Sequence, residues 1–287
     1  MNLDLKTHLS NIINDSIQNV IPISGGDISQ AYKITTPQVN YFLKVNNAPD
    51  ALTMFQTEAF SLQTIANTNT IKTPRVIVCD SFENSAFLIM EFITSKSPSS
   101  SDFKVLGAQL AQLHQCNSEY FGLDQDNFIG HLPQQNNTHK TWLDFYSYER
   151  LLPQLELAKE KNLLEDSECP TTACIKRQLQ PLFENIKPSL LHGDLWSGNY
   201  IIATDGTPYL IDPAVYYGHN EVDIAMSKLF GGFDESFYEA YFSEYPIGED
   251  TSARIEIYQL YYLLVHLNMF GRSYYSAVSS ILKKYFT

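Results

Sequence analysis

The stretch Leu190–Asp212, LLHGDLWSGNYIIATDGTPYLID, holds the most informative pattern in the chain. Its second half contains two short apolar runs, YIIA and PYLI, on either side of a turn that includes Asp205 and Gly206. An Asp-Gly pair between apolar runs favours a β-hairpin with a two-residue turn. In the register of such a turn, Asn199 lies directly opposite Asp212 at the open end of the hairpin, with Cβ atoms about 5 Å apart.

An amide oxygen and a carboxylate at that separation can share a hard divalent cation, and magnesium takes one or two protein oxygens together with phosphate and water. Asp194 stands five residues before Asn199. Protein kinases have the same spacing between the aspartate that accepts the proton of the substrate hydroxyl and the asparagine that binds metal. The stretch therefore predicts a magnesium–phosphate site, with Asp194 as the base and Asn199 and Asp212 as metal ligands. A polar turn between two strands is the alternative.

The chain changes character at the polar segment Ser95–Ser101, SKSPSSS, which is typical of a loop. Before it, apolar runs predict strands and a helical stripe predicts one helix: Tyr41–Val45, Ala86–Met90 and residues 53–66. After it, helical periodicity dominates, and Arg254–Phe270 predicts a long apolar helix that Gly271 can end. We therefore expect a small β-rich lobe over residues 1–93 and a larger, mostly helical lobe over 94–287.

The composition limits the possible functions. With 44% hydrophobic residues the chain can form a packed core, which excludes wholesale disorder. A net charge of −13, with 19 Lys and Arg spread along the chain, disfavours a nucleic-acid binder and a basic membrane-surface protein. No apolar run approaches the roughly 20 residues of a membrane span, and the start, MNLDLKTHLSNIIND, predicts no secretion signal. Four cysteines without a CxxC pair predict a reduced, cytoplasmic protein.

Two segments, His192–Asn199 (HGDLWSGN) and Asp212–Met226 (DPAVYYGHNEVDIAM), resemble the fructosamine (ketosamine) kinase family, within the aminoglycoside-phosphotransferase-like group. Further matching stretches extend the resemblance over nearly the whole chain: 41–46, 54–58, 106–114, 121–123, 229–233 and 267–271. HGDxxxxN with a later aspartate is common to many small-molecule kinases, whereas Trp196 and the YYGHNEVDIAM context are much more specific. The resemblance implies an α+β, bilobal, protein-kinase-like fold, with a small antiparallel β-sheet and one main helix before a larger helical lobe.

The resemblance also implies an activity. Such an enzyme transfers a phosphoryl group from ATP, with Mg²⁺, to the sugar O3 of a ketosamine. The ketosamine is a ribulosamine, an erythrulosamine or a fructosamine, free or on a glycated protein, and the labile product leads to deglycation. Two alternatives stay open: a related phosphotransferase acting on an aminoglycoside or choline, because fold and motif do not separate these substrates, and a non-catalytic nucleotide-binding pseudokinase.

Lys44, held in place by Glu58, is expected to bind the phosphates of ATP. In the alternating strand YFLKV, Lys44 points to the same face as Phe42. Glu58 lies in an apolar helical stripe, where a carboxylate is costly unless it is paired. The resemblance implies that Lys44 reaches the phosphates and that Glu58 holds it in place. An exposed lysine and a glutamate at the helix edge are the alternative.

The resemblance implies two further contacts with the nucleotide. Gly25 and Gly26 belong to a turn whose backbone can approach the phosphates closely, although a Gly-Gly-Asp turn is common without any ligand. Glu91, Phe92 and Ile93 follow a predicted strand, and their backbone is expected to meet the adenine edge. A plain strand end is the alternative.

The acceptor is expected to be a small molecule, because the ten residues between Asp212 and Asp223 cannot hold the activation segment of a protein kinase. Trp196 is placed either to stack on the carbon skeleton of the acceptor or to pack within its lobe. His219 and Glu221 are candidates to bind hydroxyl or amine groups of the acceptor, or to satisfy one another in a loop. Asp223 is expected to cap the helix that follows it.

Overall fold

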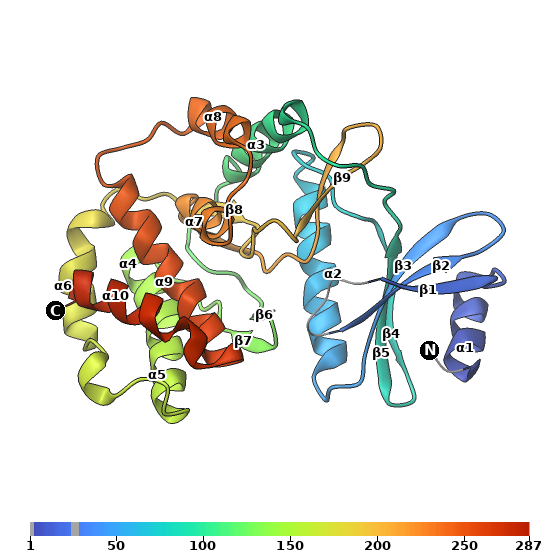
Figure 1. The fold of residues 1–287 in the computed structure, drawn as a ribbon, viewed down its shortest axis with the longest axis horizontal. Helices are drawn as coiled ribbons and strands as arrows, with labels where there is room; N and C mark the ends of the chain where they lie inside the picture. The colour runs from blue at the N-terminus through green and yellow to red at the C-terminus, as the bar shows by residue number, and fades with distance from the viewer. Residues whose placement is uncertain (1–2, 24–28, 287) are drawn as a thin grey trace. The chain divides into compact units, whose positions relative to one another are not determined.

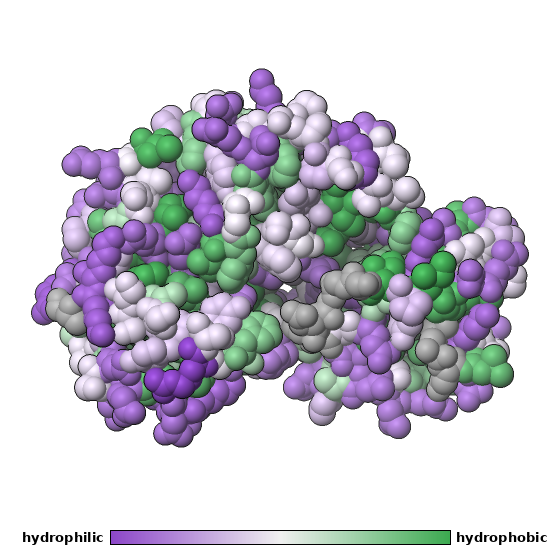
Figure 2. Space-filling view, in the orientation of Figure 1, coloured by the Kyte–Doolittle hydropathy of each residue, from purple (hydrophilic) through white to green (hydrophobic). Residues whose placement is uncertain are grey.

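The computed structural model describes residues 3–23 and 29–286. The predicted phosphate-covering turn with Gly25 and Gly26 lies outside these residues. None of the helices in the described part of the chain combines the length and the apolar character that a membrane crossing requires. Hydrophilic and hydrophobic side chains alternate in small groups on the face drawn in Figure 2.

The chain forms two compact units, and each is described by itself. The first unit contains Met1–Pro98 and Tyr200–Asp212, and the second contains Ser99–Asn199 and Pro213–Thr287. The hairpin Tyr200–Asp212 therefore belongs to the first unit, although the residues on both sides of it in the sequence belong to the second. Figure 1 traces this path by the colour of the chain.

A five-stranded antiparallel sheet in the order β1-β2-β3-β5-β4 forms the framework of the first unit. Its strands, with the two of the separate hairpin, are β1 (Asn19–Ile23), β2 (Gln30–Thr35), β3 (Asn40–Asn46), β4 (Val76–Phe82), β5 (Ser85–Glu91), β9 (Tyr200–Ile202) and β10 (Pro208–Leu210). The two apolar runs predicted as strands form the interiors of β3 and β5, which are neighbours in the sheet.

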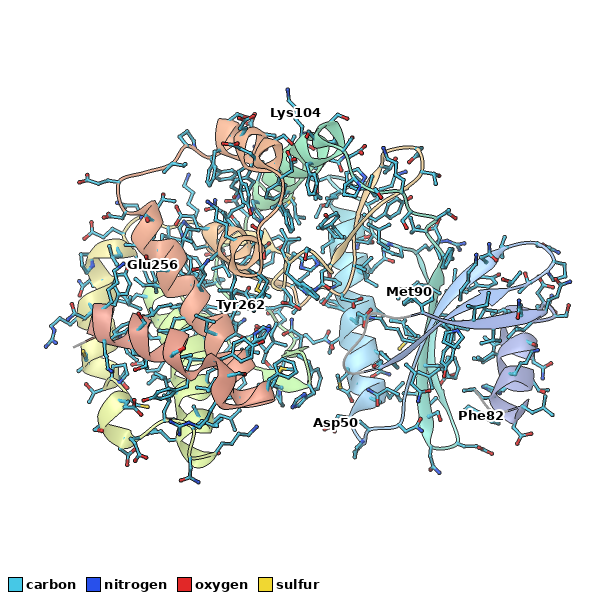
Figure 3. The ribbon with its side chains drawn as sticks, viewed as in Figure 1. Asp50, Phe82, Met90, Lys104, Glu256 and Tyr262 are labelled. Atoms are coloured by element: carbon cyan, nitrogen blue, oxygen red, sulfur yellow. The ribbon has the colours of Figure 1, made fainter. Side chains whose placement is uncertain are left out.

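Two helices pack on opposite faces of this sheet (Figure 1). The predicted helix is present as α2 (Ala51–Asn67), which packs with the side chains of Leu88 and Met90. Met90 is labelled in Figure 3. The helix α1 (Leu3–Ile13) was not predicted, and it packs with Leu43 and the other side chains that alternate to the opposite face.

The hairpin is present, but the predicted register is wrong by one residue. Tyr200 pairs with Leu210, whereas a two-residue turn at Asp205 and Gly206 would pair it with Ile211. The basis for placing Asn199 directly opposite Asp212 in the ladder is therefore lost. Any role of these two residues in metal binding has to rest on other observations.

A three-residue loop accounts for the difference in register. The N–H of Ala203 donates to the oxygen of Thr207 at 2.9 Å, and the N–H of Gly206 donates to the oxygen of Ala203 at 2.8 Å. Gly206 has a φ of 88°, the left-handed conformation that closes loops of this length. The hairpin is also tied to the rest of its unit, because Leu210 donates to the oxygen of Lys72 at 2.9 Å.

The second unit is mostly helical, with three-residue strands between its helices. Its elements are α3 (Ser100–His114), β6 (Asn127–Ile129), β7 (Leu132–Gln134), α4 (Trp142–Phe145), a π-helical turn (Tyr146–Leu151), α5 (Leu152–Glu160), α6 (Thr172–Leu179), β8 (Ser189–Leu191), β11 (Tyr216–Gly218), α7 (Glu221–Leu229), α8 (Glu235–Glu244), α9 (Thr251–Phe270) and α10 (Tyr275–Phe286). The long apolar helix predicted from the sequence is α9, and Gly271, at a φ of 85°, follows its last residue as expected. Short 3₁₀ turns cover 166–168, 180–182 and 272–274.

Helices α3 and α8 pack closely because Gly107 has no side chain. A Cβ atom at Gly107 would lie 2.2 Å from the carbonyl oxygen of Phe237 in α8. We expect Gly107→Ala to lower the free energy of unfolding by about 3 kcal/mol, because the backbone of Phe237 cannot move aside as a flexible side chain can. Urea denaturation measures this change. Gly248→Ala is the matched control, because its nearest contact is at 3.7 Å, and a change of at most about 0.5 kcal/mol is expected. Equal effects of the two variants would contradict the close packing.

Candidate functional site

In the first unit, one lysine is paired with two carboxylates. The Nζ atom of Lys44 lies 2.8 Å from Oε1 of Glu58 and 2.6 Å from Oδ1 of Asp212. Lys44 comes from β3, Glu58 from α2, and Asp212 from the end of the hairpin. The pairing of Lys44 with Glu58 that the apolar stripe predicted is present. Asp212 completes a three-residue group that sequence spacing alone did not indicate.

The two carboxylates keep the side chain of Lys44, on β3, positively charged. Burial alone would lower the pKa of Lys44, but the charges of Asp212 and Glu58 and their hydrogen bonds raise it above its ordinary value. Burial raises the pKa of Glu58 to about 7, against the opposing effect of Lys44. The ammonium of Lys44 therefore stays charged, and the two carboxylates keep it in place.

In the second unit, Asp194 lies on a loop whose backbone is bonded on several sides. Strand β8 leads into this loop, and Gly193 has a φ of 86°, which favours glycine. A Cβ atom at Gly193 would lie 2.0 Å from the oxygen of Ala214. The hydroxyl of Tyr262 in α9, labelled in Figure 3, donates to the oxygen of Gly193 at 2.7 Å. The N–H of Asp194 donates to Nδ1 of His192 at 3.2 Å.

Asp223 is the main support of this loop, and its predicted role as a helix cap is wrong. Helix α7 begins at Glu221, and the carboxylate of Asp223 is fully buried. It accepts hydrogen bonds from the N–H of His192 at 2.7 Å and of Gly193 at 2.9 Å. Nε2 of His114 lies 3.1 Å away on its other side. Burial alone would raise the pKa of Asp223, but these partners lower it below the ordinary value, so the group stays ionised.

Asn199 is bonded to Asp194, the residue predicted as the base. Its Nδ2 donates to the backbone oxygen of Asp194 at 2.8 Å and to the carboxylate Oδ2 at 3.1 Å. Both partners are acceptors, so the NH₂ group must face them, and the amide oxygen of Asn199 is directed elsewhere. An amide oxygen of this kind, like the carboxylate of Asp212, is a ligand type that suits magnesium. The donor chemistry of the predicted metal ligands therefore fits the cation.

Trp196 lies between the predicted base and Asn199 in the sequence, and its side chain is accessible. It is 38% exposed. A Cβ atom at Gly198 would lie 2.4 Å from its indole ring, so the ring lies against the backbone of the loop. The glycine is needed at this position because any side chain would displace the indole. The exposed part of the ring can stack on a ligand.

The other predicted acceptor residues, His219 and Glu221, belong to a buried polar network. The carboxylate of Glu221 binds the guanidinium of Arg254 at 2.6 and 2.7 Å and accepts from Thr251 at 2.8 Å. Nδ1 of His219 lies 2.8 Å from the hydroxyl of Tyr258 and 3.8 Å from Glu221. Binding of an acceptor by these two residues stays a prediction, and the oxygens of Glu221 are already bonded within the second unit.

The predicted adenine contacts come from the end of β5 in the first unit. The N–H of Glu91 donates to the oxygen of Arg75 at 2.9 Å, and the carboxylate of Glu91 accepts from the N–H of Arg75 at 3.3 Å. The ammonium of Lys33 lies 4.6 Å from the ring centroid of Phe92. The N–H of Glu91 is already bonded to Arg75. The predicted adenine contact therefore falls mainly on the backbone of Phe92 and Ile93.

Comparison with known proteins supports a common ancestry along the whole chain. A family model described as "Fructosamine kinase" matches residues 1–287. The chain is 42% identical to "Probable ketoamine kinase" of Lactiplantibacillus plantarum, over 98% of this chain and 99% of that protein. It is 35% identical to "Ketosamine-3-kinase" of Mus musculus, over 90% of this chain and 92% of that protein.

Solved structures confirm the predicted fold. The crystal structure titled "Putative fructosamine-3-kinase" from Haemophilus somnus matches with a TM-score of 0.88 and 30% identity, over 98% of this chain and 96% of that chain. The aminoglycoside phosphotransferase APH(4)-Ia, solved with ADP and hygromycin B, matches with a TM-score of 0.66 and 16% identity, over 98% of both chains. The second likeness concerns the fold alone. The α+β architecture with an antiparallel sheet and a helical region is therefore correct.

The buried His219 makes stability depend on pH. The N–H of Trp142 donates to the hydroxyl of Tyr258 at 2.9 Å, so the phenolic proton is left for Nδ1 of His219, and the imidazole is neutral. Burial lowers the pKa of His219 to about 4 from an ordinary 6.5. Between these two values the folded protein binds fewer protons than the unfolded chain, so stability falls as the pH falls.

From pH 7.5 to pH 5 we expect this one group to reduce the free energy of unfolding by roughly 2 kcal/mol. The variant His219→Asn, which keeps an acceptor for Tyr258, should lose that part of the pH dependence. Urea denaturation of both proteins over this pH range measures the difference. Equal pH dependence in the two proteins would show that His219 is not held neutral by burial.

Proposed function

We propose that this chain, which belongs to the fructosamine kinase family, phosphorylates the O3 hydroxyl of the sugar in a ketosamine, with ATP as the phosphoryl donor. The observation that carries the proposal is the Asp194 carboxylate, held by Asn199 on a loop whose backbone is fixed by Asp223. A base fixed in this way suits a transfer reaction that depends on positioning and charge stabilisation.

Asp194 is the proposed general base. Its carboxylate accepts the proton of the acceptor hydroxyl, while the hydroxyl oxygen forms a bond to the γ-phosphorus and the bond from that phosphorus to the bridging oxygen of ADP breaks. Asn199 donates to Oδ2 of Asp194 at 3.1 Å and so orients the carboxylate before the acceptor binds. Trp196, two residues after the base, is proposed to stack on the carbon skeleton of the sugar.

The nucleotide is proposed to bind through charge. Lys44, held by Glu58 at 2.8 Å, is the proposed partner of the ATP phosphates. Asn199 and Asp212 are each proposed as a magnesium ligand, because an amide oxygen and a carboxylate oxygen are the donors that the cation prefers. Magnesium, when bound, neutralises charge on the phosphate oxygens. The backbone of Glu91, Phe92 and Ile93 is the proposed contact of the adenine.

The acceptor is proposed to be a ribulosamine, an erythrulosamine or a fructosamine, free or on a protein lysine, and the consequence is deglycation. The names of the relatives support this class, since one is named "Probable ketoamine kinase" and another "Ketosamine-3-kinase". Aminoglycoside or choline phosphorylation stays the second candidate, because the motif around Asp194 is common to many small-molecule kinases. We also propose a cytoplasmic location, in line with the four free cysteines of the chain.

A panel of acceptors tests the proposed activity. The protein is incubated with Mg-ATP and, in turn, with ribulosamine, erythrulosamine, fructosamine, kanamycin and choline, and the release of ADP is measured. We expect turnover with at least one ketosamine and none with the last two compounds. Turnover with only kanamycin or choline would exclude a ketosamine kinase, and binding of Mg-ATP without turnover of any acceptor would support a pseudokinase.

The variant Asp194→Asn tests the proposed base. We expect kcat to fall by about 10²- to 10⁴-fold, because the amide cannot accept the proton but still fills the same space. The KM for ATP should change little. Asp124→Asn, at an exposed carboxylate of the second unit, is the control and should keep wild-type kinetics. A kcat within about threefold of the wild type for Asp194→Asn would assign the base to another residue.

A further inference from the structure

Arg150 is a fully buried cation that none of the roles above uses. It lies in the π-helical turn Tyr146–Leu151 and is 0% exposed. Within the described residues, no carboxylate forms an ion pair with its guanidinium. A buried charge without a charged partner is costly, so its hydrogen bonds and ring contacts have to compensate for lost solvation. π-Helical turns inside helical segments are often found at functional sites.

The edge of the guanidinium is bonded to neutral oxygens. Nη1 donates to the carbonyl of Gln135 at 2.7 Å and to that of Glu149 at 2.9 Å, and Nη2 donates to Oδ1 of Asn136 at 2.7 Å. Two of these acceptors lie in the segment that follows β7. Arg150 therefore connects the π-helical turn to the loop that precedes α4.

The face of the same guanidinium lies against aromatic rings. Its Cζ atom is 4.0 Å from the ring centroid of Tyr216 and 4.6 Å from that of Phe145. Such cation–π contacts are strong where water is excluded. Only an arginine can stack through its planar face and donate through its edge at the same time, because the ammonium of a lysine has no plane.

Tyr216 connects Arg150 to the loop that carries the proposed base. Tyr216 pairs with Leu191, the last residue of β8, and Asp194 follows three residues later. The N–H of Ala214 donates to the oxygen of His192 at 2.8 Å, so the pairing continues beside the loop. A shift of the Tyr216 ring would therefore move the backbone against which the loop is bonded.

A second chain of hydrogen bonds holds the same strand. The hydroxyl of Tyr261 donates to Oε1 of Gln134 at 2.5 Å, and Nε2 of Gln134 donates to Oδ1 of Asn127 at 2.7 Å. Asn127 in turn donates to the oxygen of Val215 at 2.8 Å. The segment 134–136 thus supports β11 through its own side chains and through Arg150.

We propose that Arg150 is a positioning residue for phosphoryl transfer: by stacking on Tyr216 and binding the segment 134–136, it fixes β11 and, through β11, the loop of Asp194. This inference rests on the proposed function of Asp194. Arg150 does not touch the substrate. Its removal should lower kcat and leave the proposed binding of nucleotide by Lys44 unchanged.

The experiment compares Arg150→Met, Arg150→Lys, Tyr216→Leu and Tyr216→Phe with the wild type, with a ketosamine that the wild type turns over. We expect kcat to fall about 10- to 100-fold for Arg150→Met, since small displacements of a base have effects of this size, while the KM for ATP stays within about twofold. Arg150→Lys keeps the charge but not the stacking, so it should restore little activity. Tyr216→Phe keeps the ring and should retain wild-type kcat, whereas Tyr216→Leu should lose as much as Arg150→Met.

The double variant Arg150→Met/Tyr216→Leu tests whether the two residues act as one unit. Its kcat should be no lower than that of the poorer single variant. Leu179→Ala, at a fully buried residue of α6, is the control for general destabilisation and should lower Tm without lowering kcat at a temperature where it is folded. If Arg150→Met does not fold, the two Tyr216 variants decide the outcome.

Three results would overturn the inference: a folded Arg150→Met with kcat within about threefold of the wild type, losses that multiply in the double variant, or an equal loss of kcat in Leu179→Ala. Failure of the proposed function looks different, because the wild type itself would then turn over no ketosamine. Activity of the wild type together with full activity of Arg150→Met would leave the proposed function intact and remove only the role of Arg150.

Discussion

A buried carboxylate, that of Asp223, fixes the backbone of the loop that carries Asp194. It binds two consecutive backbone N–H groups, of His192 and Gly193, and the ring of His114. A buried ionised group is stable only when hydrogen-bond donors surround it. Here two of the donors are backbone N–H groups of the loop. If the loop moves away, a buried charge loses its partners. The free-energy cost of that loss opposes movement of the loop.

The first unit uses buried charge in a different way. Lys44 is shared by Glu58 and Asp212, and all three side chains come from separate elements of that unit. Here the charges and hydrogen bonds of the two carboxylates raise the pKa of the lysine and hold its ammonium group in place. One unit thus fixes the proposed partner of the ATP phosphates, and the other fixes the loop of the proposed base. The first arrangement uses partly buried charges, and the second uses a fully buried carboxylate.

Much of the fold followed from local patterns in the sequence. The strands around Tyr41–Val45 and Ala86–Met90, the helix of the first unit, the hairpin and the long helix that ends at Gly271 were each predicted, because alternation, helical periodicity and turn residues act over a few residues. The helix α1 was missed because its packing surface is the face of a sheet formed by later residues. The turn of the hairpin was one residue longer than predicted, since an Asp-Gly pair fits both loop lengths.

The sequence by itself determined that Asp194 and Asn199 meet, because their spacing brings them into hydrogen-bond contact within one loop. It also indicated the partnership of Lys44 and Glu58, because an apolar stripe makes an unpaired carboxylate costly. Only the tertiary structure decided the contacts that Asp223, Arg150 and Glu221 make with residues distant in the chain. Their contacts depend on how helices and strands pack, and no local pattern of residues records which buried donor will meet which acceptor.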